Sequence, residues 1–140
     1  MAEGLTNKLH LRDRWCLAVT LADLRTEVVR YVDHRILILF GEIDMHTGPG
    51  LCGQLFELIE DSSLPLIVDL SAVTFCDSTG VNIAVVARKH AAQRGVMFAF
   101  VGLHGRVDRV FRITGMDRLI PTYATLPDAA HDLTRPDRLP

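Results

Sequence analysis

The sequence is short of cysteine and has no cluster of metal-binding side chains. Its three cysteines, Cys16, Cys52 and Cys76, are an odd number and lie far apart in the chain. No close group of cysteines and histidines has the spacing that a metal site requires. We therefore expect no metal and no cofactor, and the scattered thiols favour a reduced, cytoplasmic setting.

The sequence also lacks an excess of positive charge and a long apolar run. Its 15 Lys and Arg are outnumbered by 17 Asp and Glu, which gives a formal net charge of -2 at pH 7. Such a chain has no basic field to attract a phosphodiester backbone, so we expect no direct nucleic-acid binding. The apolar run at residues 15–21 is shorter than a membrane span and is followed by no convincing signal-cleavage site. We expect no membrane association.

What the sequence does have is the composition of one globular domain. It holds 140 residues, of which 49% are hydrophobic and 23% are charged. Residues 1–23 show no clean periodicity, which indicates an N-terminal arm that is either mobile or an accessory element. Residues 24–133 carry the domain, and residues 134–140 are expected to form a frayed tail.

Alternating strand and helix patterns begin at Leu24. We expect strands near residues 26–32, 36–40, 64–70, 96–101 and 120–123, and helices near residues 51–59, 79–94, 106–113 and 127–133, in the order ββαβαβαβα. Strands separated by single helices favour a parallel sheet, and the opening hairpin adds an antiparallel member. The predicted fold class is therefore α/β, with a mixed, mostly parallel central sheet packed with about four helices.

The junction between the 64–70 strand and the following helix carries the sequence Asp77-Ser78-Thr79-Gly80. Asp77 and Ser78 are both residue types that cap helix N-termini, so the side chain of one is expected to accept a first-turn amide. A phosphoryl group on Ser78 would add a charge of about -1.5 to -2 and would meet free amides at the positive end of the helix. From these four residues alone, a simple capping role for Ser78 is favoured, because such caps are common.

The helix after Ser78 is apolar around almost its whole circumference. Residues 81–87 contain one polar side chain, Asn82, whereas a helix that lies on a sheet needs a single apolar face. Either neighbouring helices bury the second face, or it forms a docking patch next to Ser78.

Three separated motifs occur in order along residues 24–133. They are Gly41-Glu42-Ile43-Asp44, the strand-to-helix segment 68–80, and Arg109-Val110-Phe111 with Thr114-Gly115-Met116. Together they resemble the STAS domain of bacterial anti-sigma factor antagonists, and the resemblance implies the STAS fold for residues 24–133.

The resemblance also implies a partner-switching function. Ser78 corresponds to the phosphorylated serine, and Thr79 is a secondary candidate acceptor. The unphosphorylated protein would bind an anti-sigma factor serine kinase and release its sigma factor; phosphorylation would inactivate it, and a serine phosphatase would restore it. The implied partner-binding residues are Asp44, Asp77, Ser78, Thr79, Gly80 and Asn82. We expect a monomer or a weak homodimer.

Several alternatives stay open. One is a ligand-sensing or structural STAS module of a signalling assembly without phosphotransfer, which a polar pocket or assembly with sister subunits would reveal. An enzyme with Ser78 as nucleophile is not expected, because the chain has no Gly-x-Ser-x-Gly elbow and no identifiable paired histidine. Asp44 has the alternative role of capping its loop. Cys76, next to the helix start, is either a packing residue or a redox-sensitive thiol.

Overall fold

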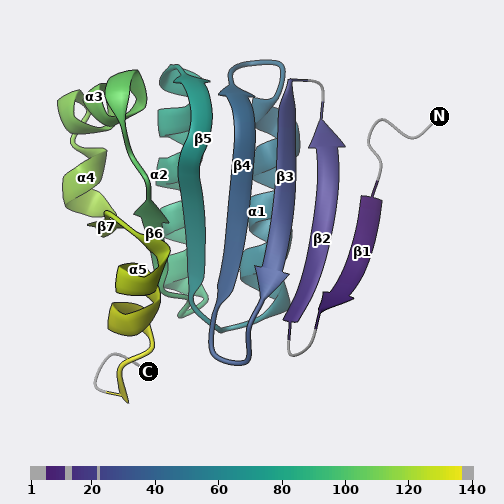
Figure 1. Cartoon of the computed structure of the whole chain (residues 1–140). Coiled ribbons are helices and arrows are strands. Elements are labelled where there is room, and N and C mark those ends of the chain that lie inside the picture. Colours follow the sequence, from purple (N-terminus) through teal and green to yellow (C-terminus); the bar gives the residue numbers. More distant parts are fainter. Residues whose placement is uncertain (1–5, 12–13, 22, 137–140) are drawn as a thin grey trace.

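Seven strands form one sheet in chain order in the computed structural model, which describes residues 6–11, 14–21 and 23–136 (Figure 1). The strands are β1 (Thr6–Leu11), β2 (Arg14–Leu21), β3 (Leu24–Arg30), β4 (Arg35–Ile43), β5 (Leu66–Cys76), β6 (Phe98–Val101) and β7 (Thr122–Tyr123). The pairs from β1 to β4 are antiparallel, and the pairs from β4 to β7 are parallel. The sheet thus changes from a meander to helix-linked parallel strands at β4.

Helices link the parallel strands, as parallel pairing requires. They are α1 (Gly48–Asp61), α2 (Ser78–Gln93), α3 (Gly105–Ile113), α4 (Met116–Leu119) and α5 (Leu126–Leu133). Helices α1 and α2 cover one face of the sheet, and α5 lies against the other face beside β6 and β7 (Figure 1). The main core fills the space between the sheet and α1 to α3, and a smaller cluster lies beneath α5. No helix within the described residues combines the length and apolarity that a membrane crossing needs.

The predicted α/β fold class is confirmed, and the elements from Leu24 onward follow the predicted order with one addition, the short helix α4. The structure therefore has five helices where about four were expected. Residues 1–23, for which a mobile arm or an accessory element was predicted, include β1 and β2. These two strands add two further antiparallel pairs to the sheet.

Strand β5 is longer than predicted, because it does not end at Leu70 but continues to Cys76. Its parallel pairing with β4 runs on to the Ile43–Cys76 pair through two register shifts. Beside the first shift, the carboxylate of Asp69 accepts the amide of Ser71 at 2.9 Å. The Asp69 carboxylate thus satisfies the Ser71 amide where the ladder is irregular. Strand β5 therefore continues to the edge of the sheet, where Asp77 follows it.

A buried arginine, Arg35, starts strand β4 and is 1% exposed. Its guanidinium donates to the carbonyl oxygens of Leu58, Ser62 (3.1 Å) and Leu64 (2.5 Å), which lie at the end of α1 and in the turn after it. Burial lowers its pKa to about 10, with a smaller effect from nearby Arg30. The group is therefore still charged at neutral pH, and it fastens the end of α1 to the sheet.

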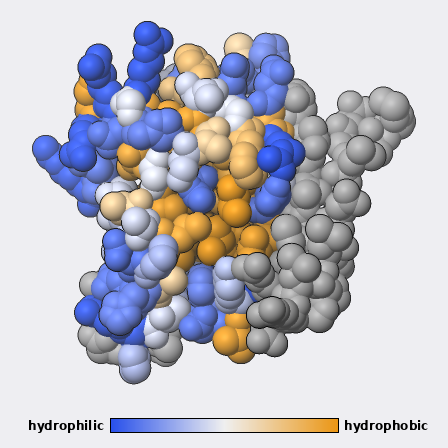
Figure 2. Space-filling model, in the orientation of Figure 1, coloured by the Kyte–Doolittle hydropathy of each residue, from blue (hydrophilic) through white to orange (hydrophobic). Residues whose placement is uncertain are grey.

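Helix α5 covers only part of its face of the sheet, and the uncovered part of that face carries an apolar patch (Figure 2). Val29, Ile38 and Phe40 contribute half-buried side chains to this face. The guanidinium carbon of Arg25 lies 3.9 Å from the centroid of the Phe40 ring and shields part of the patch from water.

Candidate functional site

The site is built where the carboxyl ends of β4 and β5 meet. Ile43 is the register partner of Cys76, and the amide of Asp77 donates to the carbonyl of Ile43 at 3.3 Å. Asp44 and Asp77, the residues that directly follow the two strands, therefore lie at the same edge of the sheet, at the top of Figure 1. This edge is where parallel sheets commonly carry functional residues.

Asp77 caps helix α2. Its backbone is extended, and its carboxylate oxygen Oδ1 accepts the amide of Thr79 at 2.8 Å. The carbonyl of Asp77 accepts the amide of Gly80 at 3.1 Å. Ser78 is therefore not the capping residue; it is the first helical residue, and its side chain is exposed.

This cap changes the expectation for a phosphoryl group. The sequence predicted that a phosphate on Ser78 would meet free first-turn amides, but the amides of Thr79 and Gly80 already donate to Asp77. A phosphate would instead lie on the solvent side of Ser78, beside a carboxylate. The helix dipole still favours it, whereas the Asp77 charge opposes it.

The remaining predicted site residues differ in exposure. Thr79 is half-buried, and a Cβ added to Gly48 would lie only 2.7 Å from its Cγ2 methyl, so Thr79 packs against the start of α1. Gly80 is buried, and a side chain there would collide with the sulfur of Cys76. Asn82 is exposed one turn after Ser78. Thus Asp44, Asp77, Ser78, Thr79 and Asn82 gather at one surface, while Gly80 lies beneath it.

Asp44 organises the loop between β4 and α1. Its Oδ1 accepts the amides of His46 (2.8 Å) and Thr47 (3.0 Å), while the Thr47 hydroxyl donates to the carbonyl of Glu42 at 2.8 Å. The amide hydrogen bonds from Thr47 and then His46 hold the pKa of Asp44 below its ordinary value. The loop-capping role of Asp44 is confirmed, and its contact with a partner stays a prediction.

Helix α2 buries one face and exposes two valines. Val81, Ile83, Ala84, Ala87 and Ala91 point into the core. Val85 and Val86, by contrast, are 40% and 46% exposed. They follow Ser78 by two turns, so part of the unusually apolar helix does remain accessible near the site.

Cys76 ends strand β5 directly below the cap. It is buried, and desolvation, followed by the charge of Asp77, raises the pKa of its thiol to about 11. A thiol with a raised pKa forms little of the reactive thiolate. The packing role is therefore favoured over the redox role.

The comparison with known protein families covers most of the domain. Residues 25–129 match the STAS domain family, which is 105 of the 140 residues. The chain belongs to the STAS domain family. Strands β1 and β2 precede the matched residues and so extend the STAS domain of this chain.

The relatives of this STAS domain are named as regulators. The anti-sigma-F factor antagonist RsfB of Mycobacterium tuberculosis is 32% identical over 104 residues, which is 72% of this chain and 84% of RsfB. An anti-sigma-B factor antagonist of Listeria monocytogenes is 35% identical over 91 residues, which is 65% of this chain and 80% of the relative. The crystal structure of an anti-sigma factor antagonist from Mycobacterium paratuberculosis superposes with a TM-score of 0.71 at 31% identity, and covers 80% of this chain and 94% of that one.

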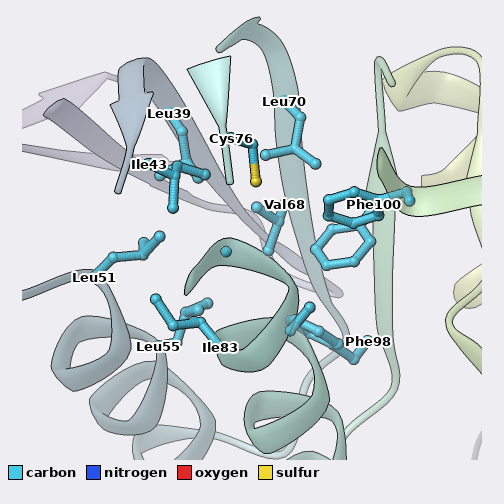
Figure 3. Close-up of a pocket in the computed structure, with 13 residues that line it drawn as sticks. Leu39, Ile43, Leu51, Leu55, Val68, Leu70, Cys76, Ile83, Phe98 and Phe100 are labelled. Atoms are coloured by element: carbon cyan, nitrogen blue, oxygen red, sulfur yellow. The ribbon is translucent and has the colours of Figure 1, made fainter. Parts of the chain in front are cut away.

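A small cavity lies inside the STAS domain beneath the start of α2 (Figure 3). Its volume is about 20 Å³, and its lining is apolar, with Ile43, Leu51, Cys76 and Phe100 pointing into it. A space of this size is close to the volume that admits a single water, so it offers no room for a nucleotide or a lipid. Nor do the described residues include a group of three or more metal-binding side chains. The ligand-sensing alternative gains no support from this cavity.

Two described histidines are engaged away from Ser78. His34 contacts the carboxylate of Asp33 at 2.6 Å, and His90 contacts that of Glu60 at 2.9 Å. These pairs lie in the β3–β4 turn and between α1 and α2, so neither forms a base for a Ser78 nucleophile.

Proposed function

We propose that this STAS domain is an anti-sigma factor antagonist controlled by phosphorylation of Ser78. In this function the unphosphorylated protein binds an anti-sigma factor serine kinase in the cytoplasm and thereby releases the sigma factor. Phosphorylation of Ser78 ends that binding, and a serine phosphatase restores it. The observation that carries the proposal is the exposed Ser78 at the first position of α2, directly after the Asp77 cap, whose amide joins the end of β5 to the end of β4.

The charge around Ser78 supports the direction of the switch. Residues 41–50 and 71–82 contain Glu42, Asp44 and Asp77 but no lysine or arginine. A phosphate there has no lysine or arginine within these segments to pair with, and enclosing it in an interface would strip its water without replacing it by such a paired charge. A loss of about 2.7 kcal/mol is enough to weaken affinity a hundredfold.

The accessibility of the two hydroxyl residues supports Ser78 over Thr79 as the acceptor. Ser78 is exposed, whereas Thr79 is half-buried with its methyl group against Gly48. A kinase must bring the acceptor oxygen in line with the transferred phosphoryl group, which a packed side chain does not permit without movement.

The acceptor assignment is tested by phosphorylation with purified anti-sigma factor kinases from the same genome and ATP. We expect one phosphate per chain, located at Ser78 by mass spectrometry and absent from Ser78→Ala. The matched variant Thr79→Val keeps the shape and the methyl contact while losing the hydroxyl, so it should be labelled like the wild type. Labelling of Ser78→Ala at the wild-type level would contradict the assignment.

The switch itself is tested by calorimetric titration with the same kinases. Ser78→Asp should bind much more weakly than the wild type, whereas Ser78→Ala should bind with nearly wild-type affinity. Equal affinities for all three proteins would argue against a switch at Ser78. Sedimentation of the free protein tests the accompanying proposal that it is a monomer or a weak homodimer.

A further inference from the structure

Two large apolar side chains are exposed within two residues of the acidic residues of the site, in the segments that end β4 and β5. Met45 is 71% exposed in the loop after β4, and Phe75 is 42% exposed two residues before Asp77. The two segments meet through the hydrogen bond from the Asp77 amide to the Ile43 carbonyl. Their exposure therefore belongs to the edge that presents Ser78.

The loop that carries Met45 is held rigid on both sides. Asp44 accepts the amides of His46 and Thr47, and the amide of Asp44 donates back to the Thr47 hydroxyl at 3.0 Å. Thr47 itself is 2% exposed. A side chain on a loop fixed in this way loses little backbone entropy when a partner binds it, which is a property of interface anchors.

Phe75 is positioned just as firmly, although by the sheet. Its register partner in β4 is Glu42, and the hydroxyl of the neighbouring Thr74 donates to the carbonyl of Gly41 at 3.2 Å. Val73, two residues before Phe75, and Cys76, the residue after it, are buried, so their side chains hold this part of the strand in the core.

We infer that Met45 and Phe75 are the apolar anchors by which this protein recognises its anti-sigma factor, and that the partner presents an apolar socket to them. This inference rests on the proposed function and specifies the chemistry of its interface. Apolar contacts beside Ser78 also account for the direction of the switch, because a dianion at the rim of an apolar socket has to give up its water.

The test measures the affinity of unphosphorylated variants for each purified anti-sigma factor kinase of the same genome by calorimetry. Met45→Ala and Phe75→Ala are each expected to weaken binding about tenfold, as truncation of an interface anchor does. Val32→Ala is the matched control, because Val32 is 88% exposed in the β3–β4 turn at the opposite end of the sheet. Its affinity should equal that of the wild type.

The outcomes separate this inference from the proposed function. If the wild type binds a kinase and Ser78→Asp does not, but Met45→Ala and Phe75→Ala bind like the wild type, the anchors are wrong and the switch stands. If the wild type binds none of the kinases, the proposed function fails and the anchors fail with it. Thermal unfolding confirms that each variant is folded. If Met45→Ala unfolds, it is replaced by Met45→Gln, which keeps the length of the side chain. Wild-type affinity of Met45→Gln would also overturn the assignment of Met45 as an anchor.

Discussion

Strand β4 has a charged residue at each end, and the two are held in opposite ways. Arg35, at the start, is buried and donates to carbonyls 23 to 29 residues away in the sequence. Asp44, just past the end, accepts amides two and three residues away and is reached by solvent. The first charge therefore holds distant elements together, while the second shapes one loop. The stabilising arginine and the proposed recognition loop therefore lie at opposite ends of the same strand.

The largest effect is expected at the start of β4, where Arg35 is buried. Arg35→Ala should lower the free energy of unfolding by about 3 kcal/mol or more, because three backbone carbonyls lose a charged donor. Urea denaturation measures the effect. Arg25→Ala is the control, because Arg25 is an exposed arginine on the neighbouring strand. This variant should lower the free energy of unfolding by less than about 1 kcal/mol. Similar losses for the two variants would show that the buried charge has no special structural role.

A steric test addresses the layer just beneath the site. Gly80→Ala places a methyl group against the Cys76 sulfur, and overpacking of this kind costs about 1–3 kcal/mol. Adding Cys76→Ala removes the colliding atom, so the double variant should lose less stability than the sum of the two single losses. Strict additivity in chemical denaturation would mean that the two residues do not compete for the same space.

The cap at the exposed end should have a smaller effect on stability. Asp77→Ala is expected to cost about 1 kcal/mol, because Thr79 loses the acceptor of its amide. Asp77→Asn keeps the cap and removes the charge, so it should unfold like the wild type in thermal denaturation. A loss in Asp77→Asn as large as that in Asp77→Ala would assign the stabilising role to charge and not to capping.

The smallest expected effect is the acid titration of Asp44. Its pKa is lowered by hydrogen bonds in the folded state, so its contribution to stability is complete above the pKa of the unfolded chain. The contribution is lost as the pH falls through the lower folded pKa. In an NMR titration the Asp44 carboxyl and the amides of His46 and Thr47 should move together, below the pH at which an unstructured aspartate titrates. Titration of Asp44 at the unstructured pH would contradict the loop geometry.

The same contrast explains what the sequence was able to predict. Periodicity located α2 and the strands from β3 onward because each pattern is contained in a few turns or residues. The Asp77 cap was foreseeable for the same reason, although the choice between Asp77 and Ser78 required the backbone geometry. The role of Arg35 was not foreseeable, because the position of the carbonyl groups that accept its hydrogen bonds depends on how α1 packs against the sheet. Likewise, the continuation of β5 to Cys76 depends on pairing with β4.

The sequence identified the residues of the candidate site, but it did not predict which of the neighbouring residues are exposed and which are buried. Ser78, Asp77 and Asp44 were identified from short motifs, and the structure brings their segments together. The exposure of Met45 and Phe75 was missed, since an apolar residue in a loop or strand end carries no signal of whether the core covers it. The burial of Gly80 beneath the cap was missed for the same reason.

The meander from β1 to β4 has a consequence for the order in which the chain acquires structure. Each of its strands pairs with the strand next to it in the sequence, whereas β5 reaches β4 only after α1 has been placed. Contacts between neighbours close short loops and form quickly. During synthesis we therefore expect the antiparallel half to assemble first and to present β4 as a template for β5. Ser78, the proposed phosphorylation site, would then be positioned only when that later strand has docked.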